Sequence, residues 1–120
     1  MKTFLLALAV TLVAGTAQAR TVCTFTTECF EDEACAETQF TVAIEAGTLG
    51  PDDIVLVTEA ETVHGAIAGA GSVDRGHFIG IGQGAVHMLT VDGASDARYT
   101  THIAEGPMSV SYIGACIEER

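Results

Sequence analysis

Basic side chains are scarce in this 120-residue chain, which has five lysines and arginines against sixteen aspartates and glutamates. Proteins that bind nucleic acid neutralise phosphates with clusters of Lys and Arg, and attachment to anionic lipid needs similar clusters. The composition therefore excludes a nucleic-acid role and attachment to anionic lipid. If charge guides a partner, that partner is a basic protein or a cation, although the same charge also serves solubility alone.

Sequence signatures of common catalytic sites are missing as well. Residues 61–64 read ETVH rather than the HExxH of metalloproteases, and no serine lies in a Gly-x-Ser-x-Gly segment. Residues 80–84, GIGQG, lack the third glycine of a dinucleotide-binding loop and precede a strand-like segment instead of a helix. We therefore expect no enzymatic activity and no cofactor.

The one long apolar run lies at the start of the chain. It covers Phe4 to Ala14, follows the positive charge of Lys2 and precedes the small-x-small segment Ala17-Gln18-Ala19. This order predicts a secretory signal peptide over residues 1–19, and the run is shorter than the roughly 20 residues that span a bilayer. We expect a single domain over residues 20–120, with a net charge of −12. It would be periplasmic or secreted, with no membrane contact after cleavage.

Helical periodicity is nearly absent, and strand periodicity dominates. Residues 39–45 alternate polar and apolar side chains, and residues 54–58 and 86–91 are rich in β-branched or alternating apolar residues. Glycine-containing turn segments separate these runs at close spacing. The pattern predicts an all-β fold, either a small antiparallel sandwich or an up-and-down barrel of seven to eight short strands. The only helix candidate is residues 28–38.

Four cysteines behind a signal peptide predict two disulfides. Cys23 lies on the apolar side of the first expected strand and Cys116 on that of the last. We therefore expect Cys23 to pair with Cys116, and Cys29 with Cys35 across a compact loop, with Cys23–Cys29 as the main alternative. The gaps of five residues fit neither a structural zinc site nor a Cys-x-x-Cys redox site.

Two of the four histidines are candidates for a shared metal ion. If the segment Asp92–Asp96 is a hairpin turn centred near Ala94-Ser95, His87 lies directly opposite His102, with the two Cβ atoms about 5 Å apart. Two imidazoles at that separation could hold zinc or copper. The alternative is two independent histidines, because a slip of one residue places them on opposite faces.

Residues 93–99, GASDARY, resemble the Ser-Ala-Ser-Gly-x-x-Tyr stretch of the small periplasmic inhibitors of c-type lysozyme. That family consists of exported β-barrels of similar length with a disulfide, and its loop is understood to reach into the lysozyme active site. The resemblance implies that Ser95 is the loop serine. Gly93 replaces the first serine of the motif, and Asp96 replaces its glycine.

The sequence thus indicates an exported, non-catalytic binding or accessory protein. Its expected partner-binding residues are Glu31, Asp32 and Glu33, which the second disulfide would present at the surface, together with Ser95. Two alternatives stay open: an inhibitor of a basic cell-wall enzyme such as c-type lysozyme, and a metal-binding protein that uses His87 and His102.

Overall fold

Eight antiparallel strands make up the chain in the computed structural model, which describes residues 20–72 and 75–119. The expected signal peptide lies outside these residues. The strands are β1 (Arg20–Phe30), β2 (Ala36–Ala46), β3 (Ile54–Val57), β4 (Thr62–Ser72), β5 (Arg75–Gly82), β6 (Ala85–Val91), β7 (Asp96–Ile103) and β8 (Met108–Glu119).

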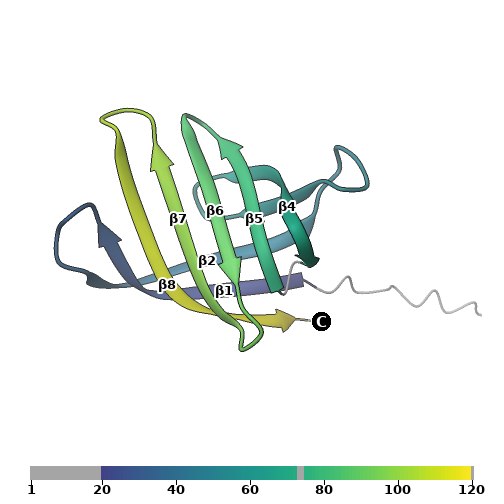
Figure 1. Ribbon diagram of the computed structural model, residues 1–120, viewed down its shortest axis with the longest axis horizontal. Helices are drawn as coiled ribbons and strands as arrows, with labels where there is room; N and C mark the ends of the chain where they lie inside the picture. Colours follow the sequence, from purple (N-terminus) through teal and green to yellow (C-terminus); the bar gives the residue numbers. More distant parts are fainter. Residues whose placement is uncertain (1–19, 73–74, 120) are drawn as a thin grey trace, which may run out of the picture.

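Each strand pairs with the next along the chain, and β8 pairs with β1 to close a barrel. Figure 1 shows the long strands β5 to β8 side by side, with β1 and β2 crossing behind them. The expected all-β fold is confirmed in its barrel form. The described residues contain no helix, and therefore none long and apolar enough to cross a membrane.

The one helix candidate, residues 28–38, does not form a helix. Residues 28–30 complete β1, a tight turn follows, and residues 36–38 begin β2. The register of β1 shifts between Phe25 and Thr27 against both of its neighbours, which marks a β-bulge. Threonine and aromatic residues near the bulge favour strand over helix.

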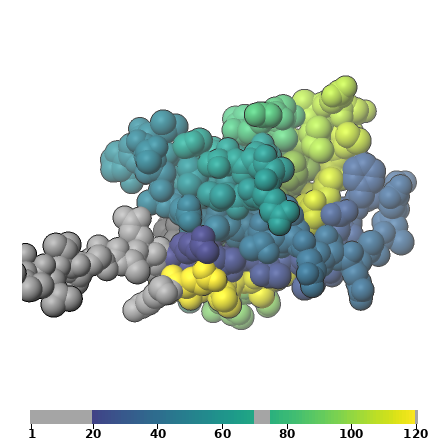
Figure 2. Space-filling model, turned by 180° about the vertical axis from the view of Figure 1, so that it is seen from behind, coloured from purple at the N-terminus to yellow at the C-terminus, as the bar shows by residue number. Residues whose placement is uncertain are grey.

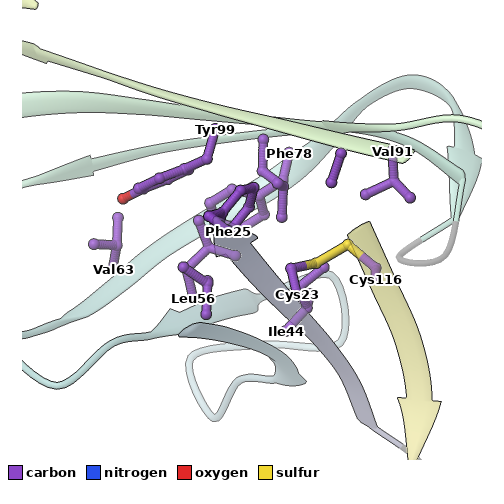
Figure 3. Close-up of a cluster of buried hydrophobic side chains, with 12 residues drawn as sticks. Cys23, Phe25, Ile44, Leu56, Val63, Phe78, Val91, Tyr99 and Cys116 are labelled. Carbon is purple, nitrogen blue, oxygen red and sulfur yellow. A yellow bond between two sulfur atoms is a disulfide. The ribbon is translucent and has the colours of Figure 1, made fainter. Parts of the chain in front are cut away.

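The barrel interior follows the period-two alternation of the strands. Its buried cluster joins aromatic and branched side chains from seven strands with the first disulfide: Cys23, Phe25, Val42, Ile44, Leu56, Val63, Phe78, Leu89, Val91, Ala97, Tyr99 and Cys116. Figure 3 shows Phe25 near the centre, the disulfide towards one end and Tyr99 towards the other.

Both expected disulfides are confirmed, Cys23–Cys116 and Cys29–Cys35. Cys23 and Cys116 are directly paired residues of the first and last strands, so this bridge reinforces the seam at which the barrel closes. Disulfides of this kind belong to oxidising compartments. The second bridge closes the turn between β1 and β2.

Glycine allows the strands to approach closely beside the bulge. A Cβ atom on Gly114 of β8 would lie 2.0 Å from the backbone oxygen of Thr24 in β1. A side chain at position 114 would therefore force the two strands apart at the seam.

The up-and-down order gives the barrel two distinct ends. The terminal end carries Arg20, Glu119, the β2–β3 and β6–β7 turns, and the paired residues Ser72 of β4 and Arg75 of β5. The distal end carries the β1–β2, β3–β4, β5–β6 and β7–β8 turns. In Figure 1 the distal turns point to the upper left and the β6–β7 turn points down.

Candidate functional site

The four residues expected to bind a partner lie at opposite ends of the barrel. Glu31, Asp32 and Glu33 form the β1–β2 turn at the distal end, and Ser95 lies in the β6–β7 turn at the terminal end. Figure 2 shows the β1–β2 turn (blue) at the right, on the same side as the yellow-green β7–β8 turn. These residues therefore form two separate surfaces.

Glu31 is held against the neighbouring strand. Its backbone N–H donates to the Ser109 carbonyl oxygen at 3.2 Å, and the Ser109 N–H donates to its carboxylate at 2.7 Å. Its φ of 49° places it in the left-handed region, where the chain reverses direction. Asp32 and Glu33 are exposed, and they present the free carboxylates of this turn.

Ser95 is the last residue of a three-residue hairpin loop, residues 93–95. Its φ of 68° is left-handed, and its N–H donates to the Asp92 carbonyl oxygen at 3.1 Å. The Asp92 carboxylate accepts hydrogen bonds from the N–H groups of Ala94 and Asp96. This is a type I turn followed by a left-handed residue, a common hairpin connection. It leaves the Ser95 side chain exposed.

The geometry of this loop shows that the expected pairing of His87 with His102 is wrong. The turn is centred one half-residue earlier than expected, so His87 pairs with Thr101, and His102 pairs with Val86. A shift of one residue moves a side chain to the other face of the sheet. His87 is 2% exposed inside the barrel, and His102 lies exposed outside. A metal ion shared by these two rings has no geometric basis in this register.

His87 belongs instead to a buried polar group in the distal half of the interior. Its Nδ1 is hydrogen-bonded to the Tyr99 hydroxyl, and the Thr101 hydroxyl lies 3.5 Å from the same nitrogen. Its Nε2 lies 3.4 Å from a carboxylate oxygen of Glu61. Burial lowers the pKa of His87, and the nearby Glu61 carboxylate partly opposes that shift.

The Nε2 atom of His87 has no hydrogen-bond partner among the described residues. A Cβ atom on Gly82 would lie 2.9 Å from this nitrogen and 3.1 Å from a Glu61 carboxylate oxygen. Gly82 therefore lets the β5–β6 hairpin cover the imidazole closely. Because the ring is enclosed, an external substrate does not reach it in this structure.

Aromatic rings complete the distal half of the interior. Phe40 stacks on Tyr112 with ring centroids 4.7 Å apart, and Tyr99 stacks on both rings at 5.9 and 5.8 Å. Burial and the nearby Glu28 carboxylate raise the pKa of Tyr112 to about 12. The sequence analysis did not predict that His87 lies inside the barrel with these rings. The alternation of His87, Leu89 and Val91 along one face of a strand is the signal that could have revealed it.

The two ends of the barrel differ in their charged side chains. Eight acidic residues lie in or next to the distal turns: Glu28, Glu31, Asp32, Glu33, Glu37, Glu59, Glu61 and Glu105. The arginines of the described chain lie elsewhere. Arg20 and Arg75 are at the terminal end, and Arg98 is three residues into β7, which begins at that end. The distal end is therefore strongly anionic.

Arg20 neutralises part of the terminal end. Its guanidinium lies 3.1 Å from Glu119 and 3.5 Å from Glu45. The imidazole of His64 lies 3.1 Å from the Asp53 carboxylate. No three His, Cys, Asp or Glu side chains gather into a metal-binding group within residues 20–72 and 75–119.

No protein family, curated protein or solved structure matches this chain.

Proposed function

We propose that this chain is an exported, non-catalytic protein that binds a basic protein partner through the distal end of its barrel. The observation that supports this is that the eight carboxylates of the distal end have no Lys or Arg beside them in the described chain, whereas Arg20 and Arg75 lie at the terminal end. Such a field steers a cationic surface towards that end and orients it there.

The arrangement of the distal end also suits binding better than catalysis. His87, the one buried histidine, is enclosed by Gly82 and Glu61. The Cys29–Cys35 bridge fixes the turn that presents Asp32 and Glu33, so little conformational entropy is lost when a partner binds there.

Calorimetric titration with two basic probes, cytochrome c and a c-type lysozyme, tests this function. We expect binding at low salt that weakens as ionic strength rises. The distal variant Asp32→Asn/Glu33→Gln/Glu59→Gln should weaken it about tenfold, since exposed carboxylates each contribute a fraction of a kcal/mol. The matched terminal variant Asp52→Asn/Asp96→Asn/Glu118→Gln should change it less than about twofold. Equal effects of the two variants would refute the distal site.

A second candidate function is inhibition of c-type lysozyme through the β6–β7 turn. The observation in its favour is the position of Ser95, exposed in a hydrogen-bonded hairpin loop. The hairpin is anchored next to the first disulfide, because the Cys116 N–H donates to the Ser95 carbonyl oxygen at 2.8 Å. A lytic assay with a c-type lysozyme tests this candidate.

The two candidates differ in which end of the barrel matters. For loop inhibition, Ser95→Gly should reduce inhibition about tenfold, because glycine keeps the left-handed backbone and removes only the hydroxymethyl group. The distal variant should then inhibit as the wild type does. If lysozyme binds the distal end instead, the distal variant should reduce inhibition and Ser95→Gly should inhibit as the wild type does.

A further inference from the structure

The β-bulge in β1 turns one carboxylate towards the interior of the barrel. The inward alternation that starts at Cys23 would place Thr27 inside and Glu28 outside. The register shift after Phe25 reverses this order, so Glu28 lies directly opposite Tyr112, which packs against the core. Directly opposed residues share one face of a sheet. Bulges often re-aim a side chain in this way beside a functional site, and here the bulge points Glu28 into the distal end.

Two aromatic rings at this end face inward and are only half-buried. Phe40 lies opposite Phe25, whose side chain is fully buried. Tyr112 lies opposite Tyr99, which is also buried. Both rings therefore face the interior. Because Phe40 and Tyr112 are still partly exposed, solvent reaches them through an opening in the barrel.

The short strand β3 leaves this opening in the wall. It pairs only with residues 43–46 of β2. Within the part of the chain that the structure describes, residues 36–42 of β2 therefore have a strand neighbour on one side only, which is β1. Phe40 lies in this stretch. A side chain of a partner can thus approach Phe40 and Tyr112 from the distal end, between β2 and the β3–β4 turn.

Glu61 supplies a second carboxylate at the same end, from the β3–β4 turn. Its side chain is 30% exposed, and its carboxylate lies 3.4 Å from Nε2 of His87. That nitrogen is buried and has no hydrogen-bond partner among the described residues, so no hydrogen bond from the imidazole satisfies the carboxylate. No Lys or Arg of residues 20–72 and 75–119 lies in the distal turns to neutralise it. Glu28, Phe40, Glu61 and Tyr112 together are called the distal mouth.

We propose that the distal mouth binds one cationic side chain, an arginine or a lysine, of the basic partner. Aromatic ring faces and carboxylates both attract a guanidinium or ammonium group, and together they hold it more strongly than either does alone. An anion would be repelled by both carboxylates, and a neutral apolar group would desolvate them without giving them a partner. This inference rests on the proposed binding of a basic protein at the distal end, and it names the group that is recognised there.

Glu37 offers a matched control, because it is a glutamate of the same end that faces the other way. It lies opposite Thr27 of β1, and Thr27 lies opposite the exposed Ile113 of β8. Glu37 is therefore on the outer face, where it acts on a partner through a field that salt screens. Glu28→Gln and Glu37→Gln remove the same charge, so their difference measures direct contact at the distal mouth.

NMR titration with N-acetyl-arginine amide tests the site without a protein partner. The ring signals of Phe40 and Tyr112 should shift and saturate with a dissociation constant of about 1–10 mM, as expected for one cation–π contact and one charge pair. N-acetyl-citrulline amide has nearly the same shape without the charge and should leave both rings unmoved. Glu28→Gln should weaken binding at least about fivefold, and Glu37→Gln less than about twofold. Wild-type signal dispersion in both variants would verify their fold.

Calorimetric titration with cytochrome c then tests whether the ligand is a partner's side chain. Glu28→Gln should weaken this binding at least about fivefold, and Glu37→Gln less than about twofold. Equal effects of the two variants would overturn the role of the distal mouth and leave the proposed binding at the distal end standing. Ring signals that do not move, or that move equally with the citrulline amide, would overturn the site itself. If the arginine amide binds through Glu28 but cytochrome c does not, the mouth is a site for free organic cations, and the assignment to a partner's side chain fails.

Discussion

His87 combines nearly complete burial with a group that titrates near neutral pH. Because burial lowers its pKa in the folded chain, the unfolded chain takes up a proton at His87 first as the pH falls. The unfolded state then binds more protons, so this residue stabilises the fold above its ordinary pKa and loses that effect as the pH falls through the folded value. The free energy of unfolding should therefore decrease between about pH 7 and pH 5.5.

Urea unfolding at several pH values measures this effect, with His87→Gln as the test and His102→Gln as the control. His87→Gln should flatten the pH dependence over this range. His102→Gln should keep the wild-type slope, since His102 is exposed on the outer face. A wild-type slope in His87→Gln would assign the pH dependence to other groups.

Tyr112 gives a second titration, at the alkaline end. Burial and Glu28 raise its pKa to about 12, and burial raises the pKa of Tyr99. These are the only two tyrosines in the chain. Absorbance at 295 nm should therefore show less tyrosine ionisation at about pH 10 in the folded protein than in urea, where half-ionisation is expected near that pH.

The same shifts have a consequence for stability. The unfolded chain loses its tyrosine protons first as the pH rises, so the free energy of unfolding should fall above about pH 10. Tyr112→Phe leaves one tyrosine and should halve the alkaline absorbance change. A tyrosine that ionises near its ordinary pKa in the folded chain would contradict the packing of Phe40 on Tyr112.

At the scale of elements, the two disulfides should differ in their contribution. By loop-closure entropy, a loop as long as that between Cys23 and Cys116 is worth ~4.7 kcal/mol, and the short loop between Cys29 and Cys35 only ~2 kcal/mol. Cys23→Ser/Cys116→Ser should therefore lower the free energy of unfolding more than Cys29→Ser/Cys35→Ser, as measured in urea. The difference in unfolding free energy between the two variants should exceed the entropic value, because the serines at 23 and 116 would be buried among apolar side chains.

The β1–β2 pair shows the limits of strand prediction from sequence. The alternation of Phe40, Val42 and Ile44 identifies β2, and the faces of Cys23 and Cys116 identify the closing pair. Residues 28–38 carry charges and a turn at which Glu31 adopts a left-handed backbone. A left-handed glutamate has no strong sequence signal, so a hairpin could not be distinguished there from a short helix.

The β6–β7 hairpin shows why the interior group was missed. One left-handed residue, Ser95, sets a three-residue loop and shifts the pairing by one position from the expected one. That shift takes His87 into the barrel and leaves His102 outside. The register of a hairpin can be predicted from its turn residues only when their backbone conformation is known. A serine can adopt several backbone conformations, so Ser95 did not reveal the register.

For the whole molecule, the sheet has three chemically different regions. The distal end is anionic, the terminal end carries Arg20 and Arg75 among its carboxylates, and the outer face of β4 to β6 has no carboxylate. Net charge alone predicts a uniformly acidic surface. The closed meander separates these regions because successive strands β4 to β6 are adjacent in the sheet as well as in the sequence.

This separation predicts where the acidic charge reduces stability. Asp32, Glu33 and Glu59 are exposed among like charges at the distal end, with no basic side chain of the described residues beside them. Neutralising them in Asp32→Asn/Glu33→Gln/Glu59→Gln should relieve repulsion and raise the thermal midpoint at 10 mM NaCl. Each neutralised charge should add a few tenths of a kcal/mol, about the value of an exposed pair.

The terminal variant Asp52→Asn/Asp96→Asn/Glu118→Gln removes the same number of charges from the end that holds Arg20 and Arg75. It should raise the midpoint less, because some of those carboxylates are attracted by the arginines. In 0.5 M NaCl, where the screening length is only about 4 Å, the two variants should both approach the wild type. A distal variant whose gain persists in high salt would mean that its effect comes from the turn rather than from charge.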